Sequence, residues 1–108
     1  MAPPFDVSIF PEGTFTLHGS LRAKPGRGDE LETLLRKIVG IIPSEHGVLT
    51  YQVARDKEDP LRFLIFETYT GRAAFSSHLE TQQFKDFWNA GVLDGALKPS
   101  FFEALTPL

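Results

Sequence analysis

Apolar and polar residues follow two kinds of period along the chain, and each change of period marks the boundary of a predicted element. Strict alternation is typical of a strand with one buried face, whereas apolar residues at positions i, i+3 and i+4 are typical of an amphipathic helix. The pattern predicts strands at residues 14–23, 48–55, 61–69 and 100–105 and helices at residues 29–42, 72–80 and 82–91. This order is that of a ferredoxin-like split βαβ, an α+β fold with one four-stranded antiparallel sheet.

The first 13 residues contain three prolines, Pro3, Pro4 and Pro11, which fit neither a helix interior nor a central strand. We therefore expect an extended N-terminal arm over residues 1–13. The remaining residues, 14–108, are long enough for a single domain with its own core.

The predicted strand at residues 61–69 is apolar on both faces, and one face also carries an acid. Phe63, Ile65, Glu67 and Tyr69 share that face, and the alternate residues share the other. Helices that pack on one side of the sheet leave its other side uncovered, so we expect a homodimer built sheet against sheet. Glu67 is then surrounded by apolar side chains, where a carboxylate needs a partner or acquires a raised pKa.

The next predicted helix carries a candidate partner for Glu67. His78 stands on the apolar stripe of that helix with Phe75 and Leu79. Two interpretations remain open from the residues alone. In one, Glu67 fixes the imidazole in a structural pair. In the other, the carboxylate raises the pKa of His78 toward 7, and the imidazole acts as a general base.

Composition narrows the range of partners. The 11 basic and 14 acidic residues form no basic stripe, so nucleic acid is not an expected partner. No apolar run reaches the roughly 18 residues that span a bilayer, and the N-terminus does not resemble a signal peptide. We therefore expect a soluble, cytoplasmic protein without a membrane partner. Ten phenylalanines suit a core or pocket that surrounds a planar aromatic or hydrophobic ligand.

The sequence gives no sign of a cofactor. The chain has no cysteine, which excludes disulfides, thiolate catalysis and cysteine-ligated metals. Its three histidines, His18, His46 and His78, are too far apart for a spaced metal motif, and no glycine-rich phosphate loop follows a strand. We therefore expect neither a metal nor another bound cofactor.

Four short motifs occur together in a fixed order. They are KPG at 24–26, S-E-x-G followed by tyrosine at 44–51, F-E-x-Y at 66–69, and H-L-x-T followed by F-K at 78–85. In this order and spacing the chain resembles the antibiotic biosynthesis monooxygenase (ABM) family, in the quinol-monooxygenase-like branch of the dimeric α/β barrels. The resemblance covers about residues 14–88.

The resemblance implies a homodimer with a pocket between sheet and helices, and oxidation of an electron-rich aromatic or quinol-type molecule by dioxygen without metal, flavin or nicotinamide. In this interpretation His78, oriented by Glu67, is the catalytic base. Five further residues are candidates for substrate contacts, although each also suits ordinary packing: Tyr51, Tyr69, Phe84, Trp88 and His18.

Two other functions remain open. A dimeric barrel of this kind also suits a non-oxidative enzyme, such as an isomerase or decarboxylase, or a protein that only binds a small molecule. Haem binding or degradation is the other alternative, because relatives of this fold do that. However, Trp88 stands where those relatives carry a haem-ligating histidine, and Gly19 or a neighbour stands where they carry an asparagine.

Overall fold

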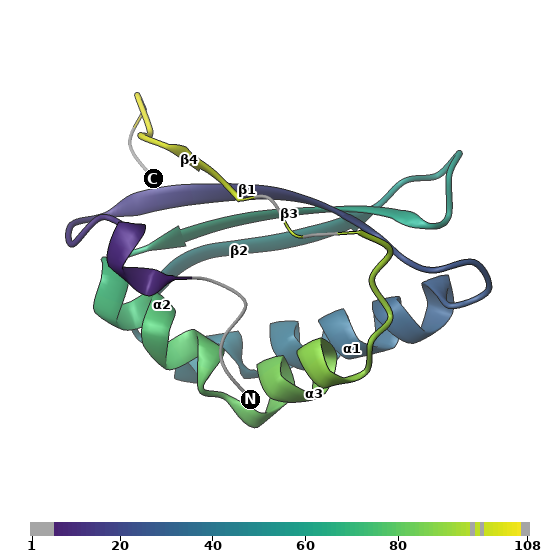
Figure 1. Ribbon diagram of the computed structural model, residues 1–108. Helices are drawn as coiled ribbons and strands as arrows, with labels where there is room; N and C mark the ends of the chain where they lie inside the picture. Colours follow the sequence, from purple (N-terminus) through teal and green to yellow (C-terminus); the bar gives the residue numbers. More distant parts are fainter. Residues whose placement is uncertain (1–5, 96, 98, 107–108) are drawn as a thin grey trace.

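The computed structural model describes residues 6–95, 97 and 99–106. Four strands and three α-helices follow one another in the predicted order (Figure 1). They are β1 (Phe15–Arg22), α1 (Gly28–Ile41), β2 (Val48–Arg55), β3 (Arg62–Tyr69), α2 (Arg72–Leu79), α3 (Gln82–Asn89) and β4 (Ser100–Phe102). The predicted ferredoxin-like α+β fold is confirmed, although β4 ends three residues earlier than expected.

The strands form one antiparallel sheet in the order β2-β3-β1-β4, so β2 and β4 are its edges. All three helices pack on one face of this sheet, as Figure 1 shows. In the pairing register, Glu67 of β3 lies between Leu17 of β1 and Tyr51 of β2. Directly opposed residues share a face of the sheet. The register therefore places these three side chains together under the helices.

The alternation predicted for β3 is confirmed. Phe63, Ile65, Glu67 and Tyr69 are all buried beneath the helices. Phe66, which points to the opposite face, is 39% exposed. This opposite face is called the open face below, because no helix within the described residues covers it.

Local sequence explains where the helices begin and end. α1 ends at Ile41 because Pro43 follows, and the chain continues in a short 3-10 helix, η2 (Ile42–Ser44). Thr81 is the N-cap of α3, since its hydroxyl accepts a hydrogen bond from the Phe84 amide at 3.2 Å. The N-cap of α2 is Gly71, whose backbone lies so close to the Glu12 carbonyl that a Cβ would come within 2.0 Å of it.

The segment before β1 is folded more tightly than an extended arm. Val7–Ile9 form a 3-10 helix, η1, because the Asp6 side chain caps it by accepting from the Ser8 amide at 3.0 Å. The prediction of an extended conformation is therefore wrong for these three residues. Phe10 is fully buried and stacks on Phe75 of α2, with ring centroids 4.4 Å apart. Residues 1–5 lie outside the described part, and the division at residue 13 stays a prediction.

Candidate active site

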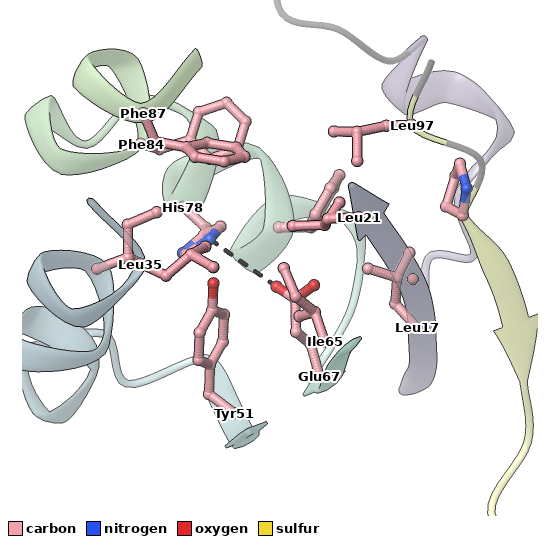
Figure 2. A pocket seen from close by; sticks show the side chains of 14 residues that line it. Leu17, Leu21, Leu35, Tyr51, Ile65, Glu67, His78, Phe84, Phe87 and Leu97 are labelled. Atoms are coloured by element: carbon pink, nitrogen blue, oxygen red, sulfur yellow. Dashed lines mark ion pairs between the residues drawn. The ribbon is translucent and has the colours of Figure 1, made fainter. Parts of the chain in front are cut away.

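A small cavity lies between the sheet and the three helices (Figure 2). Its volume is about 50 Å³. Most of its walls are apolar side chains from β1, β3 and the helices, including Leu17, Leu21, Leu35, Ile38, Ile65, Phe75, Phe84 and Phe87. Three polar side chains interrupt this lining: Tyr51, Glu67 and His78. The apolar enclosure gives these polar groups a medium of low dielectric constant, in which their charges are costly.

His78 is held from outside the cavity by a glutamate. Its Nδ1 lies 3.0 Å from Glu45 Oε1, and the two side chains are 2% and 13% exposed. An ionised carboxylate only accepts hydrogen bonds, so Nδ1 carries the proton that it donates. In the neutral imidazole, Nε2 then has a free lone pair, and this nitrogen is the one on the Glu67 side (Figure 2).

The path of the chain explains how Glu45 reaches α2. Glu45 directly follows η2, and two residues later Gly47 packs against the helix. A Cβ at Gly47 would lie only 2.3 Å from the Cβ of Ala74, so the close approach requires glycine. This contact places the η2–β2 turn on α2, and Glu45 can therefore reach Nδ1 of His78.

Glu67 does not have the role predicted for it. Its Oε1 lies 3.9 Å from His78 Nε2, which is too long for a hydrogen bond. Glu67 instead accepts a short hydrogen bond from the Tyr69 hydroxyl. The prediction that Glu67 orients the imidazole is therefore wrong, because Glu45 does so. Glu67 remains close enough to Nε2 for both groups to contact one small ligand.

Burial moves the pKa values of His78 and Glu67 in opposite directions. It lowers the pKa of His78, and the nearby Glu45 carboxylate offsets this effect only in part. The predicted rise of this pKa toward 7 is therefore wrong. Burial raises the pKa of Glu67 to about 7, although the hydrogen bond from Tyr69 opposes the rise. Near neutral pH the imidazole is therefore uncharged, and the Glu67 carboxyl is able to hold a proton.

The two tyrosines occupy different places. Tyr51 lines the cavity, and its ring centroid lies 5.5 Å from that of His78. Tyr69 is fully buried behind Glu67 and is not among the lining residues. Burial and nearby carboxylates raise the pKa of both hydroxyls. Both therefore remain protonated and can act as hydrogen-bond donors.

Three other predicted contact residues can now be placed. Phe84 lines the cavity and lies close to His78, with ring centroids 5.8 Å apart. Trp88 packs against the core while half-buried and does not line the cavity. His18 points to the open face, because its neighbour Leu17 points into the cavity. The cavity therefore brings together Tyr51, Glu67, His78 and Phe84.

Sequence reasoning missed Glu45 as a site residue, although the S-E-x-G motif contains it. Within the described chain, no group of three histidine, aspartate or glutamate side chains is arranged to hold a metal ion. No helix among those residues is long and apolar enough to cross a membrane.

The fold and the enclosed polar site define a ferredoxin-like α+β domain with a cavity between its two layers. The family model described as antibiotic biosynthesis monooxygenase (ABM) matches residues 14–90, and the chain belongs to this family. The crystal structure of PA3566 from Pseudomonas aeruginosa is similar, with 29% identity and a TM-score of 0.78. That similarity covers 88% of this chain and 97% of the other.

Two more proteins are similar to this chain. A Bacteroides thetaiotaomicron protein, provisionally named an antibiotic biosynthesis monooxygenase, is 26% identical with a TM-score of 0.79, over 88% of this chain and 92% of that one. The uncharacterized protein sll1783 of Synechocystis is 30% identical over 69 residues, which are 64% of this chain. The match spans about half of that curated relative, 47% of its length.

Proposed function

We propose that this protein is a monooxygenase that oxidises an electron-rich phenol or quinol with dioxygen, without a bound cofactor, and that His78 is its general base. Membership of the ABM family supports the general class. The observation that carries the mechanism is the orientation of His78. Its Nδ1 is held by Glu45 at 3.0 Å, and its unprotonated Nε2 is on the cavity side.

The reaction begins with proton transfer from the substrate hydroxyl to His78 Nε2. A phenolate gives up an electron far more readily than a phenol, and it reduces dioxygen by one electron. The two radicals combine to form a carbon–oxygen bond, and the O–O bond of the resulting hydroperoxide then breaks with loss of water. The substrate supplies all four electrons that reduce dioxygen and the two hydrogens of the water, so a hydroquinone and dioxygen give a hydroxyquinone and water.

The protein contributes a positioned base and a cavity with mostly apolar walls. A base with a lowered pKa is uncharged at neutral pH and is ready to accept a proton. Glu67, with its pKa of about 7, supplies a protonated carboxyl that donates a hydrogen bond to a substrate oxygen. The Tyr51 hydroxyl is a second donor in the same cavity.

Oxygen uptake tests the proposal. The purified protein is mixed with 1,4-dihydroxynaphthalene under ¹⁸O₂, and oxygen consumption and product mass are followed against the protein-free autoxidation rate. We expect uptake well above that background, with one labelled oxygen atom in each product molecule. Uptake equal to the background across a panel of quinols and anthrones would contradict the proposal. Solvent deuterium entering a substrate C–H position without oxygen uptake would instead indicate an isomerase.

We further propose that the protein forms a homodimer through the open face. Phe66 is 39% exposed and Phe102 is 53% exposed on that side, and apolar surface of this kind favours burial against a second copy. Light scattering after gel filtration tests this. Phe66→Glu should give a monomer, whereas Ile9→Glu, at another exposed apolar position, should leave a dimer. A monomeric wild-type protein would contradict the proposal.

A further inference from the structure

The cavity beside His78 is too small for a phenol or quinol. Its volume is about 50 Å³, whereas a cavity that binds benzene measures roughly 150 Å³. Pockets for larger organic ligands measure roughly 300–1,000 Å³. A phenol or quinol therefore needs additional space next to this cavity.

Such space lies on the other side of Tyr51. A groove of about 660 Å³ runs between α1 and β2, at the edge of the sheet. Tyr51 and Leu35 line both the groove and the cavity. These two side chains are therefore the partition between a small buried compartment that contains the base and a larger one that opens to solvent.

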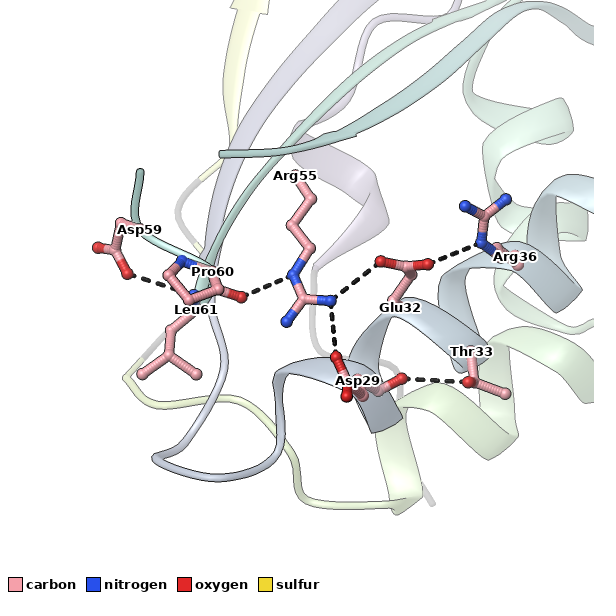
Figure 3. Close-up of polar contacts among 8 residues, drawn as sticks. All are labelled: Asp29, Glu32, Thr33, Arg36, Arg55, Asp59, Pro60 and Leu61. Atoms are coloured by element: carbon pink, nitrogen blue, oxygen red, sulfur yellow. Dashed lines mark hydrogen bonds and ion pairs between the residues drawn. The ribbon is translucent and has the colours of Figure 1, made fainter. Parts of the chain in front are cut away.

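The groove has an apolar floor and a charged rim. Val39, Val53 and Phe63 supply apolar lining, and Val39 is 41% exposed. At the rim, Arg55 donates to Asp29 at 2.9 Å and to Glu32 at 3.0 Å (Figure 3). The Arg55 guanidinium is also 5.2 Å from the Phe63 ring centroid. These contacts hold Arg55 in place, so the groove has a fixed wall at this end.

Arg36 is the more exposed of the two cations at the rim, and it has donors left for a ligand. Its side chain is 77% exposed, and its Nε donates to Glu32 at 3.0 Å. Glu32 is shared between Arg36 and Arg55, and Asp29 also bonds Arg55, so these two cations and two acids carry no net charge. A guanidinium has five N–H donors, and it binds carboxylates well. An elongated apolar molecule with an acidic end matches both the floor and the rim.

We propose that the α1–β2 groove is the outer half of the substrate site and that the substrate is an elongated, amphipathic quinol with an acidic end. Its reacting ring passes Tyr51 to reach His78, its apolar portion lies along Val39 and Val53, and its acidic group contacts Arg36. This inference rests on the proposed function for the reacting end only. Rotation of the Tyr51 ring joins the two compartments.

Binding of stable quinones tests the groove without turnover. Three probes are titrated by calorimetry: 2-methyl-1,4-naphthoquinone, a 1,4-naphthoquinone with an eight-carbon chain ending in a carboxylate, and the methyl ester of that compound. We expect the carboxylate probe to bind at least about tenfold more tightly than the chainless one. Arg36→Gln should remove about tenfold of its affinity and leave the ester unchanged, because it deletes a charge-assisted contact.

A matched pair of variants in α1 tests where the eight-carbon chain of the probe binds. A Cβ at Gly40 in the groove meets no atom within 4 Å, so Gly40→Trp is expected to fill the groove without disturbing the fold. This variant should abolish the gain in affinity that the eight-carbon chain provides. It should change the affinity of the chainless probe less than about twofold. Lys37→Trp, at an exposed position outside the groove, should change neither affinity. Equal effects of the two variants would overturn the proposal.

The partition has its own test. Tyr51→Ala should raise the association rate constant of the chainless probe about tenfold, followed through the fluorescence of Trp88, the single tryptophan. An unchanged rate would overturn the role of Tyr51. Failure of all three probes to bind would overturn the proposal that the groove is part of the substrate site. The same holds if the eight-carbon chain gives no gain in affinity. If the eight-carbon chain increases affinity but no oxygen uptake above background is found, only the proposed monooxygenase function is contradicted.

Discussion

Glutamates behave in opposite ways in the buried cavity and at the rim of the α1–β2 groove. At the rim, Glu32 accepts from Arg36 and Arg55 at 3.0 Å each, and these bonds lower its pKa (Figure 3). In the cavity, burial raises the pKa of Glu67 to about 7, and its hydrogen bond comes from the uncharged Tyr69. A counter-charge in water keeps the first acid ionised, whereas an apolar enclosure makes the second one able to hold a proton.

This difference separates structural charges from chemically useful ones. Exposed ion pairs contribute little to stability, and their protonation is fixed across the neutral range. The cavity instead contains an uncharged imidazole and a carboxyl that titrates near pH 7, which are the forms that proton transfer requires. The following variants test whether the two regions differ in this way.

The largest effect is expected at His78. His78→Ala removes the proposed base and should lower kcat by about 100-fold or more, while leaving the far-UV circular dichroism spectrum unchanged. His46→Ala is the matched control, because His46 is exposed in the turn before β2. Turnover that survives in His78→Ala would remove the imidazole from the mechanism.

The next effect concerns how the free energy of unfolding of the protein depends on pH through the buried Glu67. The folded pKa of Glu67, about 7, lies above its ordinary value of 4.5, so the folded state keeps a proton that the unfolded state releases between these values. The stability contributed by this carboxyl is complete below pH 4.5 and is lost as the pH rises to 7, a change of about 3 kcal/mol.

Glu67→Gln should abolish that loss, because glutamine mimics the protonated acid at every pH. Urea unfolding of the wild type and of the variant between pH 4.5 and 8 measures how their free energies of unfolding depend on pH. The lowered pKa of His78 makes an opposite contribution to this dependence, which is common to both proteins and cancels in the comparison. Glu32→Gln is the rim control and should leave this loss of stability in place. Parallel pH dependences of wild type and Glu67→Gln would show that the Glu67 carboxyl is ionised and solvated.

A smaller effect is expected at Glu45. Glu45→Gln keeps an oxygen that can accept from His78 Nδ1 but removes the negative charge, and turnover should fall about tenfold. Because the Glu45 carboxylate raises the pKa of His78, the acid limb of the kcat/KM profile should move to lower pH in the variant. A purely structural role would lower stability without moving this limb.

The smallest effect is expected at the rim. Arg36→Ala breaks an exposed ion pair and should shift the unfolding midpoint by less than about 2 °C, measured by calorimetry in low salt. Its kcat toward a quinol without an acidic end should match that of the wild type. A larger thermal shift would mean that the rim charges stabilise the fold and would weaken the contrast with the cavity.

The sequence was sufficient to predict the order of the elements, because the apolar period of each one is local. It also predicted that Glu67 and His78 lie between the sheet and the helices. The alternation along β3 and the apolar stripe on α2 are both set by neighbouring residues. It did not reveal the bond from Glu45 to His78. That bond depends on the close packing of Gly47 against Ala74, which joins segments that no periodic pattern connects.

The position of His18 shows the same limit. A polar residue on a strand is assigned to a face by alternation, but which face bears the helices is decided by the packing of the whole domain. Likewise, the pKa of His78 depends on the balance between burial and one nearby carboxylate, and neither quantity can be obtained from spacing.

The protonation state of the His78 ring tests the central claim most directly. Long-range ¹H–¹⁵N correlation of the imidazole at pH 7 distinguishes a protonated Nδ1 from a protonated Nε2 and from the doubly protonated cation. The structure predicts a neutral ring with its proton on Nδ1 beside Glu45 and a free Nε2 on the cavity side. A proton on Nε2, or an imidazolium at this pH, would contradict the assignment of His78 as the base.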